Sequence, residues 1–385
     1  MDRIYLCLAH MSGKEQKYIQ EAFDTNWVVP LGPNVNAFED DLAAFVSQRK
    51  GTEPLQKEVV ALSAGTAAIH LGLVMLGVEK GDEVICQSFT FAASANPVAY
   101  QGATPVFVDS EPDTYNMDPQ LLEEAIKDRM AKTGRKPKAI IPVYLYGMPA
   151  RIDDILEVAR RYEIPVLEDA AEGFGSRYRG QVCGTFGDYG VMSFNGNKMI
   201  TTSGGGALIC PDKEAKKRVM FYATQAREPY PYYQHEKIGY NYRLSNICAG
   251  IGRGQMTVVD EHIAHHQWVH EQYEQRFGEI SEITVHSAPE SIMEANYWLS
   301  TIRFNDGKTT INGNLLPLIE KLSAANIETR PLWKPMHLQP IYKDAPAYTN
   351  GVSERLFSCG LCLPSGPYVK EAEIEYIVKT IVENI

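Results

Sequence analysis

The sequence predicts an α/β protein in which helices cover both faces of a mainly parallel sheet. From residue 58 onward, short runs rich in β-branched residues alternate with helical stretches of about 10–15 residues, as βαβ crossovers require. Hydrophobic residues make up 44% of the chain and charged residues 22%, which is ordinary for a globular protein. The 385 residues are enough for two or three domains of the usual size.

Seven runs are predicted as strands because β-branched, aromatic and other apolar residues dominate them. They cover residues 58–63, 83–87, 104–109, 138–146, 165–171, 189–194 and 206–210. Helices are predicted between them, where apolar residues recur at helical spacing, at residues 66–76, 91–101, 119–131 and 152–163. The last two strands have no long helix between them.

The second half of the chain is predicted to contain a smaller domain. From about residue 255 to residue 277 the sequence has the pattern of one long helix. We expect a large α/β domain over residues 1–255 and a small α+β domain over residues 256–385. Residues 330–333 and 362–366 are predicted to be loops or edge strands, because prolines interrupt them.

Composition and charge exclude several classes of function. The net charge of -11 gives nucleic acid no electrostatic attraction. No run approaches the ~20 apolar residues of a membrane span. The first residues lack the basic and long apolar regions of a signal peptide. We therefore expect a cytoplasmic protein that binds neither nucleic acid nor membrane.

The cysteines and histidines are not expected to bind metal. The seven cysteines, an odd number in a long chain, are predicted to be free and mostly buried thiols. Cys359 and Cys362 form a lone CxxC, which lacks the second pair of a zinc site. The long helix carries four histidines without an HExxH pattern, so we expect a solvated or dimer-contact face at His262, His265, His266 and His270.

Two signals follow the first two predicted strands, at the sheet edge where ligands bind in such folds. Gly65 and Thr66 begin a helix and would offer N–H groups and a hydroxyl to a phosphate. The alternative is an ordinary turn with Thr66 as N-cap. Phe91 follows the second strand, where its ring could stack on a flat heterocycle. Packing in the core is the alternative for Phe91.

Two further signals follow later strands. Glu168 and Asp169 end an apolar strand, and one of them is expected to meet a cation because unpaired buried acids are costly. Asp169 beneath a protonated ring nitrogen is one interpretation, and N-capping of the next segment is the other. Lys198 lies in a stretch without other charges between Asp188 and Asp212. A lysine in such a site can form an imine with an aldehyde.

Together the four signals provide what pyridoxal 5'-phosphate (PLP) requires. The small residues form a phosphate nest, the aromatic ring stacks, the carboxylate keeps the pyridine nitrogen protonated, and the lysine carries the aldehyde as an imine. The glycines after Lys198 leave room for a cofactor, although GGG followed by a strand is no dinucleotide fingerprint.

The order GT…TFAAS…EDAAE…SFNGNK…GYNYRLSNICAGIG resembles the DegT/DnrJ/EryC1/StrS family of sugar aminotransferases over nearly the whole chain. The resemblance implies a fold-type I PLP-dependent enzyme with a mainly parallel seven-stranded sheet, working as a homodimer with shared active sites. The stretches FNGNKMITTSGGG, TQARE, GYNYRLSN and IETRPLWKPMH most resemble UDP-N-acetylbacillosamine pathway aminotransferases. Gly204 fits that subgroup, because the wider family often has glutamate there.

Carried over by position, the resemblance implies roles in cofactor binding and catalysis. Lys198 would form the imine with PLP and move the proton between carbon atoms. Asp169 would pair with the pyridinium nitrogen, Glu172 would lie near the ring hydroxyl, and Phe91 would stack on the ring. The phosphate would be held by residues from two subunits, namely Gly65, Thr66 and Ser193 of one and Asn241 of the other.

The resemblance also implies a substrate side. Arg243 would help to bind the nucleotide diphosphate, and the loop with Asn26, Trp27 and Leu31 would face the sugar nucleotide. Arg227 fits either this site or a solvated surface. A C-terminal segment would complete the substrate side with Arg330, Trp333 and His337.

The implied reaction moves an amino group from L-glutamate to C4 of a nucleotide-linked 4-keto-6-deoxy sugar, first of all UDP-2-acetamido-2,6-dideoxy-4-ketohexose. A GDP-4-keto-6-deoxymannose aminotransferase, which makes perosamine, is the alternative. A PLP-dependent sugar dehydratase would carry histidine in place of Lys198. A non-catalytic regulatory protein on the same scaffold would not need Lys198, Asp169 and Ser193 intact.

Overall fold

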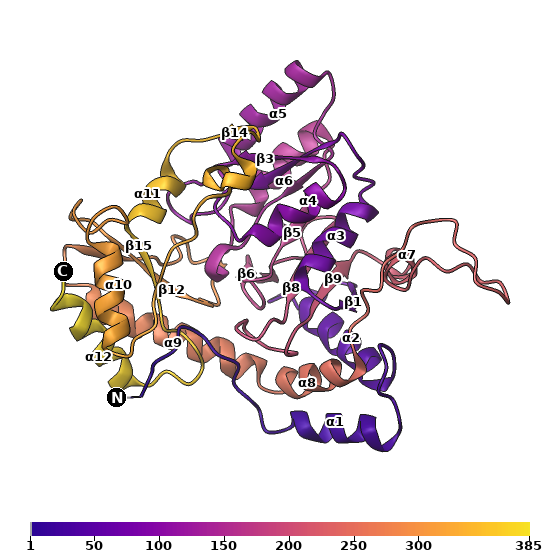
Figure 1. Ribbon diagram of the computed structural model, residues 1–385, viewed down its shortest axis with the longest axis horizontal. Coiled ribbons are helices and arrows are strands. Elements are labelled where there is room, and N and C mark those ends of the chain that lie inside the picture. Colours follow the sequence, from indigo (N-terminus) through magenta and orange to yellow (C-terminus); the bar gives the residue numbers. More distant parts are fainter. Residues whose placement is uncertain (1) are drawn as a thin grey trace.

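A central sheet organises the computed structural model, which describes residues 2–385 (Figure 1). Its strands form two hydrogen-bonded groups. One group contains, in spatial order, β1 (Glu58–Leu62), β9 (Gly206–Cys210), β8 (Tyr189–Ser193) and β5 (Leu167–Asp169). The other contains β4 (Ala139–Ile141), β2 (Glu83–Gln87), β3 (Thr104–Val108) and β14 (Ala347–Tyr348).

The two groups continue each other between β5 and β4. Ile140 N donates to Pro165 O at 3.0 Å and Asp169 N donates to Pro142 O at 2.9 Å. Within the sheet only β9 runs antiparallel to its neighbours. All seven predicted strands are therefore present in one mainly parallel sheet, and β14 from the C-terminal part extends it.

Helices cover both faces of the sheet, as predicted. Val84 and Cys86 of β2 pack in one cluster with α3 (Gly65–Met75), α4 (Asn96–Tyr100) and α7 (Lys213–Ala223). Ile85, between them, packs in another cluster with α5 (Pro119–Thr133) and α6 (Ile152–Tyr162). Because neighbouring strand residues point to opposite faces, the continuous apolar runs of the strands fill two cores.

Several predicted elements are shorter in the structure, two of them because of a proline. The strand expected over 138–146 ends at Ile141, because Pro142 has no N–H to continue the ladder. A 3-10 turn follows at Leu145–Gly147. The helix expected over 91–101 is divided into the 3-10 turn Ala92–Ser94 and α4, because Pro97 disfavours helical backbone before it.

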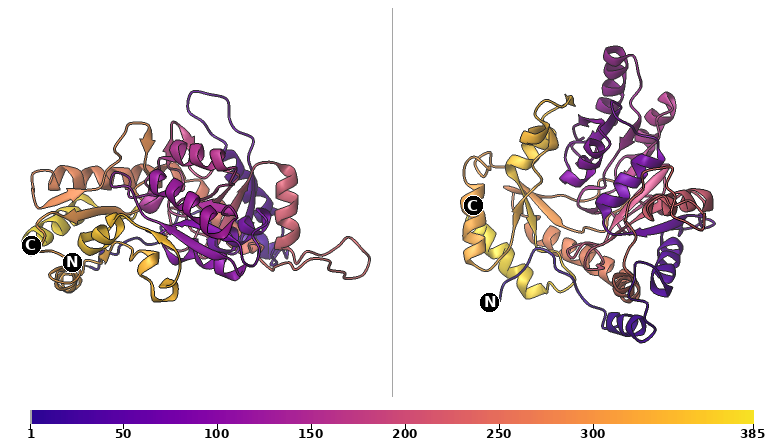
Figure 2. Two further views of the ribbon diagram at one scale, coloured as in Figure 1. Left: turned by 90° about the horizontal axis from the view of Figure 1, so that it is seen from above. Right: turned by 45° about the vertical axis from the view of Figure 1, so that its right-hand side comes forward.

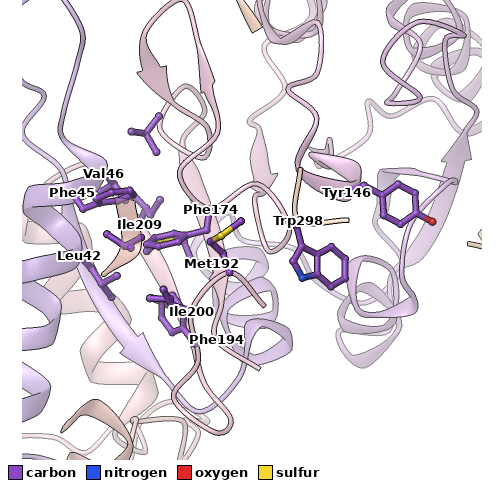
Figure 3. Close-up of a cluster of buried hydrophobic side chains, with 14 of the residues drawn as sticks. Leu42, Phe45, Val46, Tyr146, Phe174, Met192, Phe194, Ile200, Ile209 and Trp298 are labelled. Carbon is purple, nitrogen blue, oxygen red and sulfur yellow. The ribbon is translucent and has the colours of Figure 1, made fainter. Parts of the chain in front are cut away.

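A third cluster lies against the edge with β1. It contains residues of α2 (Pro33–Val46) and α8 (Asn246–Met256), and α1 (Glu15–Asp24) packs on α8. Figure 3 shows Phe45, Phe174, Met192 and Phe194 of this cluster, with Trp298 lying between them and Tyr146. A small sheet of β11 (Met293–Glu294), β6 (Arg177–Tyr178) and β7 (Gln181–Val182) completes this part.

The C-terminal part has its own antiparallel sheet and core (Figure 2). The strand order is β10 (Ile283–Val285), β12 (Ser300–Phe304), β15 (Gly360–Leu363) and β13 (Arg330–Pro331). Helices α9 (Val259–Phe277), α10 (Leu315–Ala324) and α12 (Glu371–Val382) pack on it. Helix α11 (Val352–Cys359) leads into β15.

Two expectations for this part need correction. Residues 362–363 belong to the buried strand β15, which has a partner on each side, because the proline that suggested an edge comes only after the strand. A turn at Thr257 and Val258 separates α8 from α9, so the long helix begins at Val259 rather than near residue 255. Ile4 packs in the C-terminal core. The domain boundary at residues 255–256 stays a prediction.

The segment from residue 224 to residue 242 forms an arm that extends away from the body of the molecule (Figures 1 and 2). Its exposed apolar side chains include Tyr232, Tyr233 and Ile238.

All seven cysteines are free and five of them are buried, as expected. None of the helices described is both long and apolar enough to span a bilayer.

Candidate active site

A cavity of about 340 Å³ opens at the carboxyl edge of the central sheet. Residues that follow β1, β2, β5 and β8 line it, because parallel strands end on the same side. The structure thereby brings together seven of the predicted cofactor residues, which are Gly65, Thr66, Phe91, Asp169, Glu172, Ser193 and Lys198.

One end of the cavity is a cradle for an anion. Helix α3 begins at Gly65, and no side chain caps its first N–H groups. A Cβ at Gly65 would lie 3.1 Å from Ser193 Cβ, and one at Gly206 would lie 2.4 Å from Gly65 N. Glycine at both positions therefore lets Ser193 approach the helix start. Free N–H groups, the helix dipole and the Ser193 hydroxyl favour a phosphate here, whereas Thr66 does not serve as the N-cap.

Phe91 provides a flat apolar face on the cavity. It is 52% exposed, so the alternative of core packing is wrong. Its ring centroid lies 5.2 Å from that of Trp333, which supports it from the side. A half-exposed ring held in this way can stack on a flat heterocycle.

The two adjacent acids at the end of β5 have different environments. Glu168 accepts bonds from the Tyr144 hydroxyl and from the N–H groups of Gly184, Phe186 and Gly187, so it stabilises a loop. Asp169 lines the cavity and accepts from Ser94 Oγ at 2.7 Å and Ala171 N at 3.1 Å.

Burial raises the pKa of Glu168 and of Asp169. Among the residues that the structure describes, neither acid has a cation within salt-bridge distance. The bond from Ala171 N matches the N-capping interpretation, but the carboxylate still faces the cavity. A buried carboxylate with an open side favours a ligand that brings a positive charge.

Lys198 reaches the same cavity and contacts two groups. Its Nζ lies 3.4 Å from Glu172 Oε1 and 3.8 Å from the centroid of the Trp298 ring. Glu172 is fixed by Tyr146 N, which donates to its other oxygen at 2.7 Å. Burial raises the pKa of Glu172, and the Lys198 charge opposes that rise. Sequence reasoning missed Trp298, which lies 100 residues further along the chain and carries no local signal.

These residues fit PLP. The helix start with Ser193 suits its phosphate, the exposed face of Phe91 suits its ring, and the unpaired Asp169 suits a protonated nitrogen. The amine of Lys198 is only partly exposed and lies in the same cavity as the other groups. A lysine amine is the group that an aldehyde cofactor needs.

Five predicted residues lie outside this cavity, on exposed surface. Asn241 pairs with Thr224 at the base of the arm. Trp27 and Leu31 are 38% and 52% exposed on the loop between α1 and α2. Asn26, on the same loop, and Arg227, on the arm, are exposed too. None of these five residues lines the cavity of this chain.

Arg243 and His337 have partners within the chain. The Arg243 side chain is buried, pairs with Glu39 and donates to Ala61 O at 3.1 Å. This geometry argues against the expected contact with a diphosphate. His337 Nδ1 lies 2.6 Å from Ser88 Oγ and its Nε2 lies 3.1 Å from Glu354, so it ties α11 to the end of β2.

A second cavity, of about 670 Å³, lies beside the first. Arg330 and Trp333 line it, as do Trp298 and Asn197, the neighbour of Lys198. Arg330 pairs with Glu328 at 2.9 Å. The N-terminal residues 3 and 5–8 form another wall, which sequence reasoning did not predict. The cavity adds a mostly apolar space next to the amine.

The histidines of α9 do not form the expected solvated or dimer-contact face. His262, His266 and His270 are buried, at 5%, 0% and 1% exposure. Their rings contact Met199 O, Tyr297 O and the Tyr297 ring respectively. Burial lowers the pKa of His266 and His270 to about 3, so both are neutral. Their surroundings come from segments far away in the sequence, which explains the wrong prediction.

Comparisons with known proteins support the same assignment. Residues 10–382 match the DegT/DnrJ/EryC1/StrS aminotransferase family. EpsN of Bacillus subtilis (strain 168), provisionally assigned as a pyridoxal phosphate-dependent aminotransferase, is 46% identical over 99% of this chain and 95% of its own. A GDP-perosamine synthase of Caulobacter vibrioides is 36% identical over 99% and 98% of the two chains.

Solved structures of the same family share the fold. The crystal structure of a DegT DnrJ EryC1 StrS aminotransferase from Brucella abortus matches with a TM-score of 0.87 and 30% identity, over 96% of this chain and 95% of that one. The expected fold-type I architecture is thereby confirmed. The chain belongs to the DegT/DnrJ/EryC1/StrS aminotransferase family, whose members are PLP-dependent transaminases.

Proposed function

We propose that the protein transfers an amino group from L-glutamate to C4 of a nucleotide-linked 4-keto-6-deoxy sugar, with UDP-2-acetamido-2,6-dideoxy-4-ketohexose as the first candidate. One observation carries the chemistry: Lys198, Asp169 and the cradle at Gly65 line a single cavity. The relative named GDP-perosamine synthase supports a nucleotide sugar as substrate class. The preference for UDP rests on the resemblance of residues 194–206 and 327–337 to the bacillosamine subgroup.

Several residues of the cavity have a task in this reaction. Bound PLP supplies an aldehyde that exchanges with amines and a ring that takes up electrons. The first turn of α3 and Ser193 bind the phosphate, and Phe91 orients the ring. Asp169 holds a positive charge at the ring nitrogen. In the first half-reaction Lys198 Nζ would move the proton of the donor α-carbon to the cofactor, and in the second it would move a proton from the cofactor to C4 of the sugar, a general acid–base role.

The GDP-linked ketone remains the second candidate, because a GDP-perosamine synthase is 36% identical over nearly the full length of both chains. The two candidates share the chemistry at the reacting carbon. They differ in the base, the diphosphate surroundings and the substituent at C2 of the sugar. The substrate assay therefore has to offer both ketones.

The substrate assay uses purified protein with PLP and L-glutamate, and mass spectrometry of the sugar product. We expect the UDP-linked 4-keto sugar to be converted to a 4-amino sugar, with 2-oxoglutarate formed in equal amount. Conversion of only the GDP-linked ketone would select the second candidate. Consumption of glutamate without conversion of either sugar would retain the aminotransferase and reject both sugars.

We further propose a homodimer in which Asn241 of one subunit binds the phosphate of the PLP that the neighbouring subunit holds. Support comes from exposed apolar side chains on the arm and on the loop after α1, among them Tyr233 at 79%, Ile238 at 84% and Leu31 at 52%. Such side chains are costly to leave in water and are typical of surfaces that bind another protein. Asn241 itself is exposed at the base of the arm, where it has no contact with the cavity of its own chain.

A mixture of two inactive variants tests this sharing of sites. Lys198→Ala and Asn241→Ala homodimers are each expected to have little activity. If Asn241 acts across the interface, each mixed dimer contains one intact site, so random exchange of subunits restores about a quarter of the wild-type activity. No recovery, with subunit exchange verified by two different tags, would place Asn241 outside the partner's site.

A further inference from the structure

The amine of Lys198 contacts an aromatic side chain, Trp298, to which the proposed reaction assigns no role. We propose that Trp298 is a positioning residue whose indole face, together with the Glu172 carboxylate, holds the protonated amine of Lys198 in the cavity. Lys198 Nζ lies 3.8 Å from the ring centroid and 3.4 Å from Glu172 Oε1. A π face attracts an ammonium group but not a neutral amine. The inference rests on the proposed role of Lys198 in carrying the proton.

The indole is buried and its orientation is fixed. Trp298 is 2% exposed, and its Nε1 donates to Asn197 O at 2.6 Å. The ring therefore cannot rotate away from Lys198 without breaking a buried hydrogen bond. Cation–π contacts are strongest when water is excluded from them. Figure 3 shows the indole lying between the main cluster of apolar side chains and Tyr146.

A single buried amide links both partners of the lysine. Asn296 is fully buried, and its Oδ1 accepts from Trp298 N at 2.7 Å. Its Nδ2 donates to Glu172 O and to Phe174 O, both at 2.9 Å. The backbone that presents the carboxylate and the backbone that presents the indole are thus tied together, although they are more than 120 residues apart.

Backbone strain next to Trp298 points to a functional constraint. Tyr297 has φ of 48°, a left-handed conformation that is unfavourable for an aromatic residue. His266 Nδ1 lies 3.2 Å from Tyr297 O, and the His270 ring stacks on the Tyr297 ring at 3.5 Å. The buried histidines of α9 therefore maintain the strained turn that aims the next residue at Lys198.

The arrangement suits a lysine that gains a charge during the reaction. When Nζ accepts the proton of the donor α-carbon it becomes a cation, and groups already aimed at that cation lower the barrier without rearranging. The titratable groups that face the amine are Glu172, Asp169 and Cys7. Burial raises the pKa of the Cys7 thiol to about 12, so it stays neutral. Glu172 is the carboxylate that contacts the amine, and the Trp298 ring contacts it as well.

Lysine labelling on the cofactor-free protein tests the inference without substrate or turnover. Only the neutral amine reacts with acetic anhydride, so the pH dependence of Lys198 acetylation, measured by peptide mass spectrometry, reports how well the ammonium form is held. We expect the half-maximal pH to fall by about one unit in Trp298→Leu, and by less in Trp298→Phe, which keeps a weaker π face. The rate at the alkaline plateau reports access to the lysine separately.

Trp268→Leu is the matched control, because Trp268 packs in the C-terminal core beside His265 and not near Lys198. It should leave the labelling profile unchanged. Equal half-maximal pH in wild type, Trp298→Phe and Trp298→Leu would overturn the inference. If Trp298→Leu does not fold, fluorinated tryptophans at position 298 provide a second test, because they weaken the π face without changing the shape of the side chain. A half-maximal pH that does not fall as fluorine is added would then overturn the inference. Failure of both sugars in the substrate assay would leave this result unaffected, so the two proposals fail separately.

Discussion

Lys198→Ala is expected to lower the rate of transamination by at least about 10⁴-fold, because it removes both a covalent attachment and a general acid–base. No other lysine lines the cavity among the described residues, so no side chain can replace it. Borohydride treatment should fix PLP to the wild-type chain and not to the variant. Mass spectrometry of the intact protein measures this difference independently of any substrate.

Lys216→Ala controls for the loss of a partly buried lysine. The Lys216 amine pairs with Glu58 at 3.0 Å, outside the cavity. This variant should retain near wild-type activity and covalent PLP. A Lys198→Ala protein that kept more than about a hundredth of the wild-type rate would contradict the proposed role, because general acid–base catalysis alone contributes about 10²–10⁴-fold.

The central sheet was predictable because its strands are buried on both faces. Runs such as residues 206–210 are apolar at every position and need no knowledge of distant contacts to be recognised. Their order in chain, and the rule that parallel strands share a carboxyl edge, also brought Gly65, Asp169 and Lys198 to one place. Local sequence patterns were therefore sufficient to predict the central sheet and the place of these three residues, because strands and helices alternate regularly along this part of the chain.

Residues whose roles depend on non-local contacts were not predictable. Trp298 acts from a strained turn held by Asn296 and by helix α9, and nothing within a few residues of it signals Lys198. His266 was expected on a solvated or dimer-contact face because the helix is amphipathic and lacks an HExxH pattern, yet it is buried, and the Tyr297 carbonyl compensates its burial. Arg243 looked available because its neighbours in sequence are uncharged, whereas Glu39 lies beside it in space.

Asp169→Asn is expected to have opposite effects on catalysis and on the stability of the cofactor-free protein. The variant loses the charge that matches a protonated ring nitrogen, and breaking a buried ion pair costs enough to lower kcat/KM by about 10²- to 10³-fold. Asparagine fits the site, because its Oδ1 can accept from Ala171 N and its Nδ2 can donate to Ser94 Oγ. The shape of the cavity should therefore be retained.

The stability effect follows from the direction of the pKa shift. Burial raises the pKa of Asp169 in the folded protein above its unfolded value, so the protonated form is favoured by folding. Its contribution is fully present below the unfolded pKa, near 4, and is lost as the pH rises through the folded pKa. At neutral pH the burial of this carboxyl group without a cationic partner therefore costs stability, and the neutral asparagine removes that cost.

Thermal unfolding of the cofactor-free proteins measures this effect. Asp169→Asn should raise Tm at pH 7 by a few degrees, corresponding to about 1 kcal/mol, and should flatten the fall of Tm above about pH 4. Added PLP should stabilise the wild type more than the variant, because only the wild type gains an ion pair. Asp344→Asn, at an exposed position, should change neither quantity. A lower Tm for cofactor-free Asp169→Asn would mean that the carboxylate already has a compensating partner, and its assignment to the ring nitrogen would lose its physical basis.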